Sequence, residues 1–157
     1  MRRTTRQPEG TALDTGLRLL GQRAHSRREL ALKLARRGFD REAVEAALDR
    51  LTELGYLDDA GYAATLVERR SGQRGATAIA AELRDKGVSR ELTEAALGEL
   101  DEDRQLAAAQ RLAGRLLASS GDGANAQRVA LKLVRRGFSS EVAWAAVRQS
   151  NMKDFGG

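Results

Sequence analysis

SRRELALKLARRGFDREAVEAAL, at residues 26–48, recurs with changes as GATAIAAELRDKGVSRELTEAAL at 75–97 and NAQRVALKLVRRGFSSEVAWAAV at 125–147. The glycines Gly38, Gly87 and Gly137 align the copies, which lie 49 and 50 residues apart. Repetition at this period is typical of arrays of small supersecondary units that bury their core by stacking on neighbours. The sequence therefore predicts that function lies along an extended surface and not in one enclosed pocket.

Each copy has the pattern of two helices separated by a glycine. Ser26, followed three residues later by Glu29, predicts a capping box at the start of the first helix. Gly38 sits where a left-handed residue ends that helix, because a residue without Cβ accepts positive φ at low cost. Asp40 then caps the second helix. The same two roles fall to Gly87, Gly137, Ser89 and Ser139 in the other copies.

A further amphipathic helix precedes each pair, and no stretch shows the alternation of a strand. The predicted fold is all-α, with three tandem three-helix repeat units forming an elongated, curved array. We expect a basic flexible arm at 1–11, repeat units at 12–57, 58–100 and 101–150, and a C-terminal tail at 151–157. The third unit is expected to contain a loop at 119–123, SSGDG.

Composition narrows the function classes. The chain lacks cysteine, which excludes disulfides and thiolate metal sites, and its one histidine, His25, is expected to be exposed and without catalytic duty. No phosphate-binding glycine loop or nucleophile elbow is present. No apolar run reaches the roughly 20 residues of a membrane span, and residues 1–7 do not resemble a signal peptide. We expect a cytoplasmic, monomeric protein that is not an enzyme and takes no cofactor or metal.

Positive charge gathers in arginine doublets, while the formal net charge is only +5. Doublets before Gly38 and Gly137 also suit the negative end of a helix dipole, so a purely local role stays open. Gly75, beside the third cluster, permits close backbone approach. The predicted partner- or DNA-binding residues are Arg27, Arg28, Arg36, Arg37, Arg69, Arg70, Arg74, Lys132, Arg135 and Arg136.

Acidic and aromatic residues are interpreted as structural. In the Asp58-Asp59 pair, either carboxylate is expected to cap the following helix in preference to binding metal. Phe39, Phe138 and Trp144 fall in the apolar pattern of the repeat and are predicted core residues. Tyr56 and Tyr62 are predicted to pack between units. These assignments leave the basic doublets as the main candidates for binding.

Several of these motifs together resemble the RecX family. They are YLDDxxYA at 56–63 and RGxxxIxxELxxKGV at 74–88, flanked by SxxELxxKLxxRGF at 26–39 and KLxRRGF at 132–138. Their order and spacing agree over about residues 12–150. The residues that carry the structural motif are Tyr56, Leu57, Asp58, Asp59, Tyr62, Gly38, Gly87 and Gly137.

The resemblance implies a regulator, mainly an inhibitor, of the RecA recombinase in recombination and SOS repair. Such proteins bind the RecA filament on single-stranded DNA, lie in its groove, and suppress ATP hydrolysis, strand exchange and coprotease activity. The partners implied are the RecA filament and single-stranded DNA, contacted directly or through the filament.

Two alternatives remain from the residues alone. One is a DNA-binding protein with helix-turn-helix-like units. It is disfavoured because the segment 40–54, in the place of a recognition helix, carries five acids against two arginines. The other is a helical adaptor unrelated to RecA, which composition does not exclude.

Overall fold

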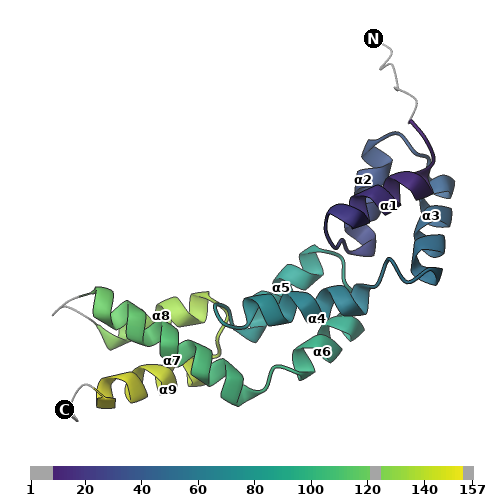
Figure 1. Cartoon of the computed structure of the whole chain (residues 1–157). Helices are drawn as coiled ribbons and strands as arrows, with labels where there is room; N and C mark the ends of the chain where they lie inside the picture. The colour runs from purple at the N-terminus through teal and green to yellow at the C-terminus, as the bar shows by residue number, and fades with distance from the viewer. Residues whose placement is uncertain (1–8, 121–124, 154–157) are drawn as a thin grey trace.

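The computed structural model describes residues 9–120 and 125–153, and within these ranges it contains helices and no strand. The helices run in the order α1 (Ala12–Gln22), α2 (Arg27–Arg36), α3 (Arg41–Glu53), α4 (Asp59–Arg70), α5 (Ala76–Asp85), α6 (Arg90–Gly98), α7 (Glu102–Ser119), α8 (Ala126–Arg135) and α9 (Ser140–Lys153) (Figure 1). The predicted all-α class is confirmed. Most of the predicted arm, the core of the 119–123 loop and the end of the tail lie outside the described residues.

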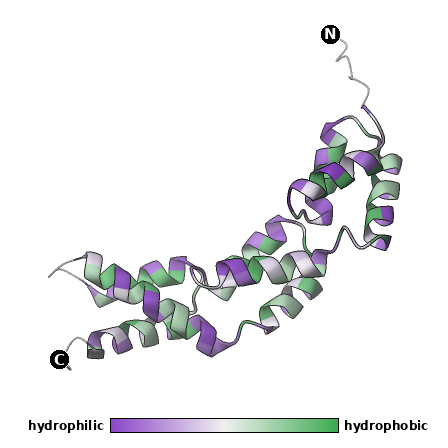
Figure 2. Cartoon of the chain, in the orientation of Figure 1, coloured by the Kyte–Doolittle hydropathy of each residue, from purple (hydrophilic) through white to green (hydrophobic). Residues whose placement is uncertain are grey.

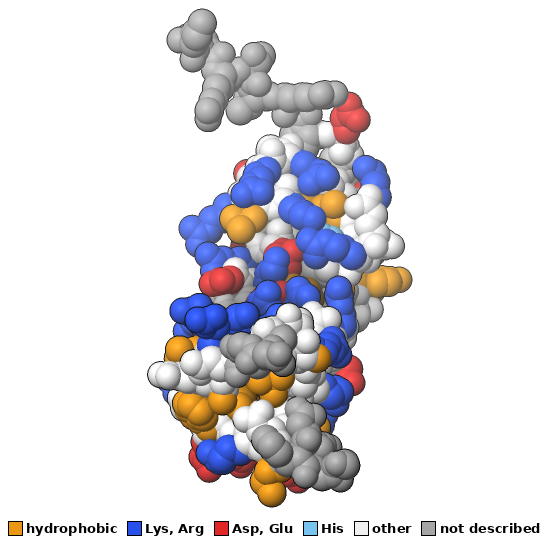
Figure 3. All heavy atoms as spheres, turned by 90° about the vertical axis from the view of Figure 1, so that its left-hand side faces the viewer, with side chains coloured by type: hydrophobic (Ala, Val, Ile, Leu, Met, Phe, Trp, Pro, Cys, Tyr) orange, Lys and Arg blue, Asp and Glu red, His pale blue; other side chains and the backbone are white. Residues whose placement is uncertain are grey.

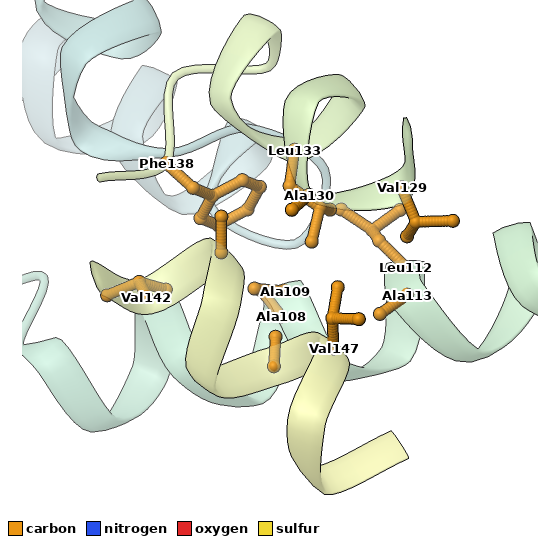
Figure 4. Packing of buried hydrophobic residues seen from close by; sticks show 12 residues of the cluster. Ala108, Ala109, Leu112, Ala113, Val129, Ala130, Leu133, Phe138, Val142 and Val147 are labelled. Carbon is orange, nitrogen blue, oxygen red and sulfur yellow. The ribbon is translucent and has the colours of Figure 1, made fainter. Parts of the chain in front are cut away.

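The helices pack in consecutive threes, and we name α1–α3, α4–α6 and α7–α9 units 1, 2 and 3. Each unit has its own buried cluster, and Leu30, Ile79 and Leu133 are fully buried members of the clusters of units 1, 2 and 3. The most extensive helix contacts lie within units. In unit 3 the small side chains of Ala109 and Ala113 let α7 approach α8 and α9 closely (Figure 4). Small core residues bury little apolar area each, so each core is modest.

Caps and glycine turns form as the repeat predicts. The side chains of Ser26 and Asp40 accept hydrogen bonds from the third residue of their helices, at 3.2 and 2.8 Å. Gly38, Gly87 and Gly137 have φ of 95, 77 and 96°. The amide after each glycine bonds back to a helix carbonyl, in the pattern of a Schellman motif. In the predicted capping box only Ser26 plays its part, because the Glu29 carboxylate binds Arg23 and Tyr62 instead.

The array is elongated and bent (Figure 1). The second helix of each unit, α2, α5 or α8, lies on the inner side of the bend, and the third helix, α3, α6 or α9, lies on the outer side. Hydrophobic and hydrophilic residues alternate along the helices (Figure 2), as expected for helices that bury one face. None of the described helices is long and apolar enough to cross a membrane.

The aromatic residues divide between core and surface. Phe138 is buried and Phe39 packs partly buried against the core of unit 1, as predicted. The prediction for Trp144 is wrong: its ring is 40% exposed, because Val142, Ala143, Ala146 and Val147 occupy the inward face of α9. Tyr56 is 60% exposed, so its predicted packing between units is also wrong.

Candidate partner-binding surface

Units 1 and 2 meet through side-chain hydrogen bonds. The Ser26 hydroxyl donates to the carbonyl oxygen of Lys86 at 2.5 Å, and the amide of Arg27 donates to Asp59 Oδ1 at 2.8 Å. The Tyr62 hydroxyl donates to Glu29 Oε1 at 2.8 Å. Tyr62 therefore joins the units as predicted. The two aspartates of the motif have different roles. Asp58 caps α4 by accepting a hydrogen bond from the amide of Gly61, whereas Asp59 accepts one from Arg27 of unit 1.

The hydrogen bond between Tyr62 and Glu29 is accompanied by shifts in the pKa of both residues. Although burial opposes the shift, hydrogen bonds from Arg23 and Tyr62 lower the pKa of Glu29. Burial, together with the hydrogen bond to the Glu29 carboxylate, raises the pKa of Tyr62 to about 12. The pair thus favours an ionised Glu29 and a neutral Tyr62, which is the combination that this hydrogen bond requires.

His25 lies buried at the same junction, with 2% of its surface exposed, so the prediction of an exposed residue is wrong. Its Nδ1 is 2.9 Å from the carbonyl oxygen of Arg23, and its Nε2 is 2.8 Å from Lys33 Nζ. Because a carbonyl only accepts and an ammonium only donates, Nδ1 carries the proton. Burial lowers the pKa of His25, and the charges of Arg23 and Lys33 add to the effect. A cleft of about 240 Å³ adjoins it, lined by Leu20, Ala24, His25, Tyr56, Asp58, Gly61, Tyr62 and Thr65.

Units 2 and 3 meet backbone to backbone. The amide of Gly75 donates to the carbonyl oxygen of Arg136 at 2.9 Å, and the amide of Thr77 donates to that of Gly137 at 3.3 Å. A Cβ at Gly75 would lie 2.3 Å from the Gly137 carbonyl carbon, which confirms the close approach expected there. Glycine is required at Gly75 by this contact and not by its φ, which is −82°.

Equivalent parts of the repeat build both junctions. In each case the start of a unit's second helix, at Ser26 or Gly75, lies against the glycine turn of the following unit. At the first junction the Arg28 side chain covers Gly87, and at the second Ala78 lies against Gly137. Internal repetition in the sequence is thus matched by repetition of the contact between units.

The predicted binding residues fall into two groups. Some are engaged within the chain: Arg27 pairs with Glu45 and Asp49, Arg70 pairs with Glu82, and Arg74 lies 3.8 Å from Glu82. The others make no ion pair among residues 9–120 and 125–153, although Arg28 packs on Gly87. These are Arg28, Arg36, Arg37, Arg69, Lys132, Arg135 and Arg136. Their part in binding stays a prediction.

Positive charge concentrates along the inner side of the bend. Of the seven predicted binding residues without an ion pair in the described chain, four lie on the second helices α2 and α8, and two more, Arg37 and Arg136, directly follow these helices. Seen from the left-hand side of Figure 1, Lys and Arg side chains crowd the upper and middle parts of the molecule, with few Asp and Glu among them (Figure 3). The acidic helix α3 lies on the outer side. If α3 served as a recognition helix, its own acids would face the DNA phosphates and be repelled by them. This weakens the helix-turn-helix alternative.

No group of three or more His, Asp or Glu side chains in the described part of the chain is arranged to hold a metal ion. Sequence reasoning missed several residues at the junctions. Ser26 was expected only to cap α2, and Gln73, which lines a cleft with Arg74, Arg135 and Arg136, was not considered. The repeat register itself could have located both, because they align with residues at the other junction.

Comparison with known proteins identifies the architecture. The models for the first and second three-helix domains of RecX match residues 12–51 and 58–97, which is half of the chain. The chain belongs to the RecX family. Two similar relatives are regulatory proteins RecX, each 38% identical to the chain. The one from Mycobacterium ulcerans aligns over 83% of this chain and 79% of its own length, and the one from Halorhodospira halophila over 90% and 89%.

Solved RecX structures share the fold. The crystal structure of RecX from Lactobacillus salivarius superposes with a TM-score of 0.82 at 19% identity, over 90% of this chain and 95% of that one. A second crystal structure, of a regulatory protein RecX, has a TM-score of 0.76 at 27% identity, over 83% of this chain and 67% of that one. The tandem three-helix arrangement is thus a RecX-family architecture.

Proposed function

We propose that this chain regulates the RecA recombinase by binding the RecA filament on single-stranded DNA and occupying its groove. The expected result is suppression of ATP hydrolysis, strand exchange and coprotease activity, in the cytoplasm and without a catalytic step of the chain's own. The observation that carries the proposal is membership of a family whose relatives are named regulatory proteins, RecX.

The shape of the molecule supports binding to a polymer. Three units in a row present equivalent second helices along one inner side, so one monomer offers repeated contacts to a partner made of repeated subunits. Linked contacts of this kind strengthen binding without any single contact being strong. Arg36 and Arg135 occupy the same place in units 1 and 3, and both lie exposed at the end of a second helix.

The bend and its charge support groove occupancy over a flat contact. The inner side carries Arg36 and Arg135, which make no ion pair in the described chain, whereas acids of α3 lie on the outer side (Figure 1). A filament formed on DNA is a polyanion in part, and complementary charge accelerates encounter and sets orientation. The bend would turn the basic side toward the filament axis.

The test is the single-strand-DNA-dependent ATP hydrolysis of the cognate RecA, measured with this protein added from substoichiometric to equimolar amounts. Inhibition far below one molecule per RecA protomer would indicate capping or propagation along the filament, and inhibition only near saturation would indicate groove occupancy. An unchanged hydrolysis rate at every ratio would refute the proposal and leave a helical adaptor for another partner.

A further inference from the structure

The cleft of about 240 Å³ where unit 1 meets unit 2 gathers side chains that are scarce elsewhere in the chain. The sequence has two tyrosines and one histidine, and all three, Tyr56, Tyr62 and His25, line this cleft. The carboxylate of Asp58 lines it as well, whereas none of its lining residues is a lysine or an arginine. In a chain with a formal net charge of +5, a hollow walled by aromatic rings and a carboxylate is suited to a cation.

The Asp58 carboxylate keeps one oxygen for a ligand. Its Oδ1 accepts a hydrogen bond from the amide of Gly61 at 3.1 Å and caps α4, whereas its Oδ2 accepts none from the described residues. A Cβ on Gly61 would lie 2.5 Å from Oδ2, so the glycine leaves space beside this oxygen. Because Gly61 also lines the cleft, that space is part of the hollow.

The aromatic residues offer their ring faces to a ligand. The Tyr62 hydroxyl is occupied by Glu29, and both ring nitrogens of His25 have partners. The Tyr56 side chain is 60% exposed and makes no hydrogen bond to the described residues. A guanidinium group can stack on an aromatic face while its N–H groups donate to a neighbouring carboxylate.

The cations around the cleft have other partners. Arg23 pairs with Glu29 at 2.8 Å, and Lys33 Nζ lies 2.8 Å from His25 Nε2. Burial lowers the pKa of His25, and the charges of Arg23 and Lys33 add to the effect, so the imidazole is neutral at neutral pH. Asp58 is therefore the only ionised residue in the lining of the cleft.

The second junction shows that folding does not require this set of residues. The cap of α7, Asp101, aligns with the cap of α4. The positions that align with the two tyrosines and the histidine hold Glu99, Gln105 and Arg74. The position of the glycine holds Arg104, whose amide donates to Asp101 at 2.8 Å in the same capping bond. A junction of this design thus forms without an aromatic ring and accepts a side chain beside the cap, so the composition of the first cleft calls for a reason other than folding.

We propose that this cleft binds an arginine side chain presented by a protein partner. Its volume of about 240 Å³ lies below the roughly 300–1,000 Å³ of pockets for drug-sized ligands, which fits a single side chain. Arginine is favoured over lysine because its planar guanidinium stacks on a ring and bonds a carboxylate at the same time. A nucleic acid is disfavoured because Asp58 would repel its phosphates. The inference goes beyond the proposed function and does not depend on it.

The test is a titration of the full chain with N-acetyl-arginine amide, followed by NMR of the tyrosine and histidine ring protons at neutral pH and constant ionic strength. Because the chain has no other tyrosine or histidine, each of these signals reports on the cleft. We expect saturable shifts with a dissociation constant in the millimolar range, as suits one exposed ion pair with a ring contact. N-acetyl-citrulline amide, which has the shape of the arginine probe without its charge, should bind about fivefold more weakly.

Two variants remove the recognition groups and keep the fold. Asp58→Asn should weaken binding of the arginine probe about fivefold, since asparagine caps a helix as well as aspartate does but carries no charge. Tyr56→Leu removes an exposed ring and should weaken binding about threefold. The matched control, Asp101→Asn, changes the equivalent cap of α7 and should bind like the parent chain. Circular dichroism checks that helicity is unchanged in all three.

Four results would overturn the inference. They are the absence of a saturable shift with the arginine probe, equal affinity for the arginine and citrulline probes, parental affinity in Asp58→Asn, and displacement of the arginine probe by oligo-dT with shifts of the same ring signals. Equal affinity for the two probes would make the cleft an uncharged slot, and displacement by oligo-dT would assign it to a DNA base. Because no RecA is present in this titration, its outcome is separate from that of the ATP hydrolysis assay.

Discussion

Gly75 lies so close to Gly137 that it has no room for a Cβ, because one built there falls 2.3 Å from the Gly137 carbonyl oxygen. A Cβ on Gly137 would in turn lie 2.4 Å from the Cβ of Ala78. The contact between the two glycines joins units 2 and 3 through their main chains. The first junction relies on hydroxyl and carboxylate groups instead. The two junctions thus use equivalent parts of the repeat but are sensitive to different changes. A larger side chain would disturb the second junction, and a change in the protonation of its side chains would disturb the first.

Gly75→Ala should destabilise the second junction, because the added methyl group overlaps backbone that cannot rotate away. Overpacking of this kind typically costs about 1–3 kcal/mol. We expect earlier urea unfolding and a larger radius of gyration by small-angle X-ray scattering. Gly114→Ala, on the exposed face of α7 with nothing within 4 Å of its Cβ, is the control and should stabilise the helix. Equal stability of the two variants would show that the close approach is absent in solution.

Tyr62→Phe should alter stability at alkaline pH. The pKa of Tyr62 is raised to about 12 in the fold, against 10.0 for an ordinary tyrosine. Its contribution is therefore fully present below pH 10 and is lost as pH rises towards 12. The free energy of unfolding should fall over that interval in the parent chain and less steeply in Tyr62→Phe. Tyr56→Phe, at an exposed ring, is the control and should keep the parental slope.

The contribution of His25 to stability should be lost at acid pH. Because its pKa is lowered below 6.5 in the fold, its contribution is present above pH 6.5 and is lost as pH falls towards the folded pKa. Protonated Nε2 could no longer accept from Lys33 and would face the ammonium group. The proton NMR signal of this sole histidine should titrate below pH 6.5, and His25→Gln should flatten the acid limb of stability. Titration of this signal at or above pH 6.5 would contradict the buried, neutral assignment.

Gly38→Val should destabilise unit 1 by about 1–2 kcal/mol, because φ of 95° strains a β-branched residue. Gly38→Asn is the paired variant, since asparagine tolerates the left-handed region better and should be less destabilised. Chemical unfolding followed by circular dichroism ranks the three proteins. A valine variant as stable as the asparagine variant would argue against a strained turn.

Arg69→Gln and Arg70→Gln should separate binding from internal pairing. Arg69 is exposed without an ion pair in the described chain, whereas Arg70 is held by Glu82 at 2.8 Å. Under the proposed function, Arg69→Gln should weaken inhibition of RecA at unchanged stability. Arg70→Gln should release Glu82 and lower stability by less than about 1 kcal/mol, as for surface ion pairs. If both variants inhibit like the parent chain at moderate salt, this cluster is not part of the binding surface.

The sequence predicted what depends on neighbours along the chain. The caps at Ser26 and Asp40 and the glycine turns follow from patterns a few residues long, and all of them form. The failures involve contacts across elements. His25 precedes a helix cap, a position that is usually exposed. It is buried by its contacts with Lys33 and by the neighbouring unit 2, neither of which the local sequence indicates. Glu29 had a local partner in the capping box, but Tyr62 and Arg23 outcompete it.

Trp144 shows that an apolar position in the repeat does not guarantee burial. An apolar residue in a repeat pattern suggests burial, yet four smaller side chains fill the inward face of α9 and leave the indole outside. Pattern alone does not distinguish the largest apolar residue from those that fit. For the binding surface, the sequence indicated the arginines, but their division into internally paired and unpaired groups required the structure.

The confinement of strong helix contacts within each unit bears on how the protein is made. A nascent chain emerges from the ribosome at about 5–20 residues per second, and helix contacts between sequence neighbours close far faster than that. The core of unit 1 needs nothing beyond Leu57, so it can assemble while units 2 and 3 are still being translated. Growth of the array would then proceed one unit at a time, each new glycine turn docking on a helix start already in place.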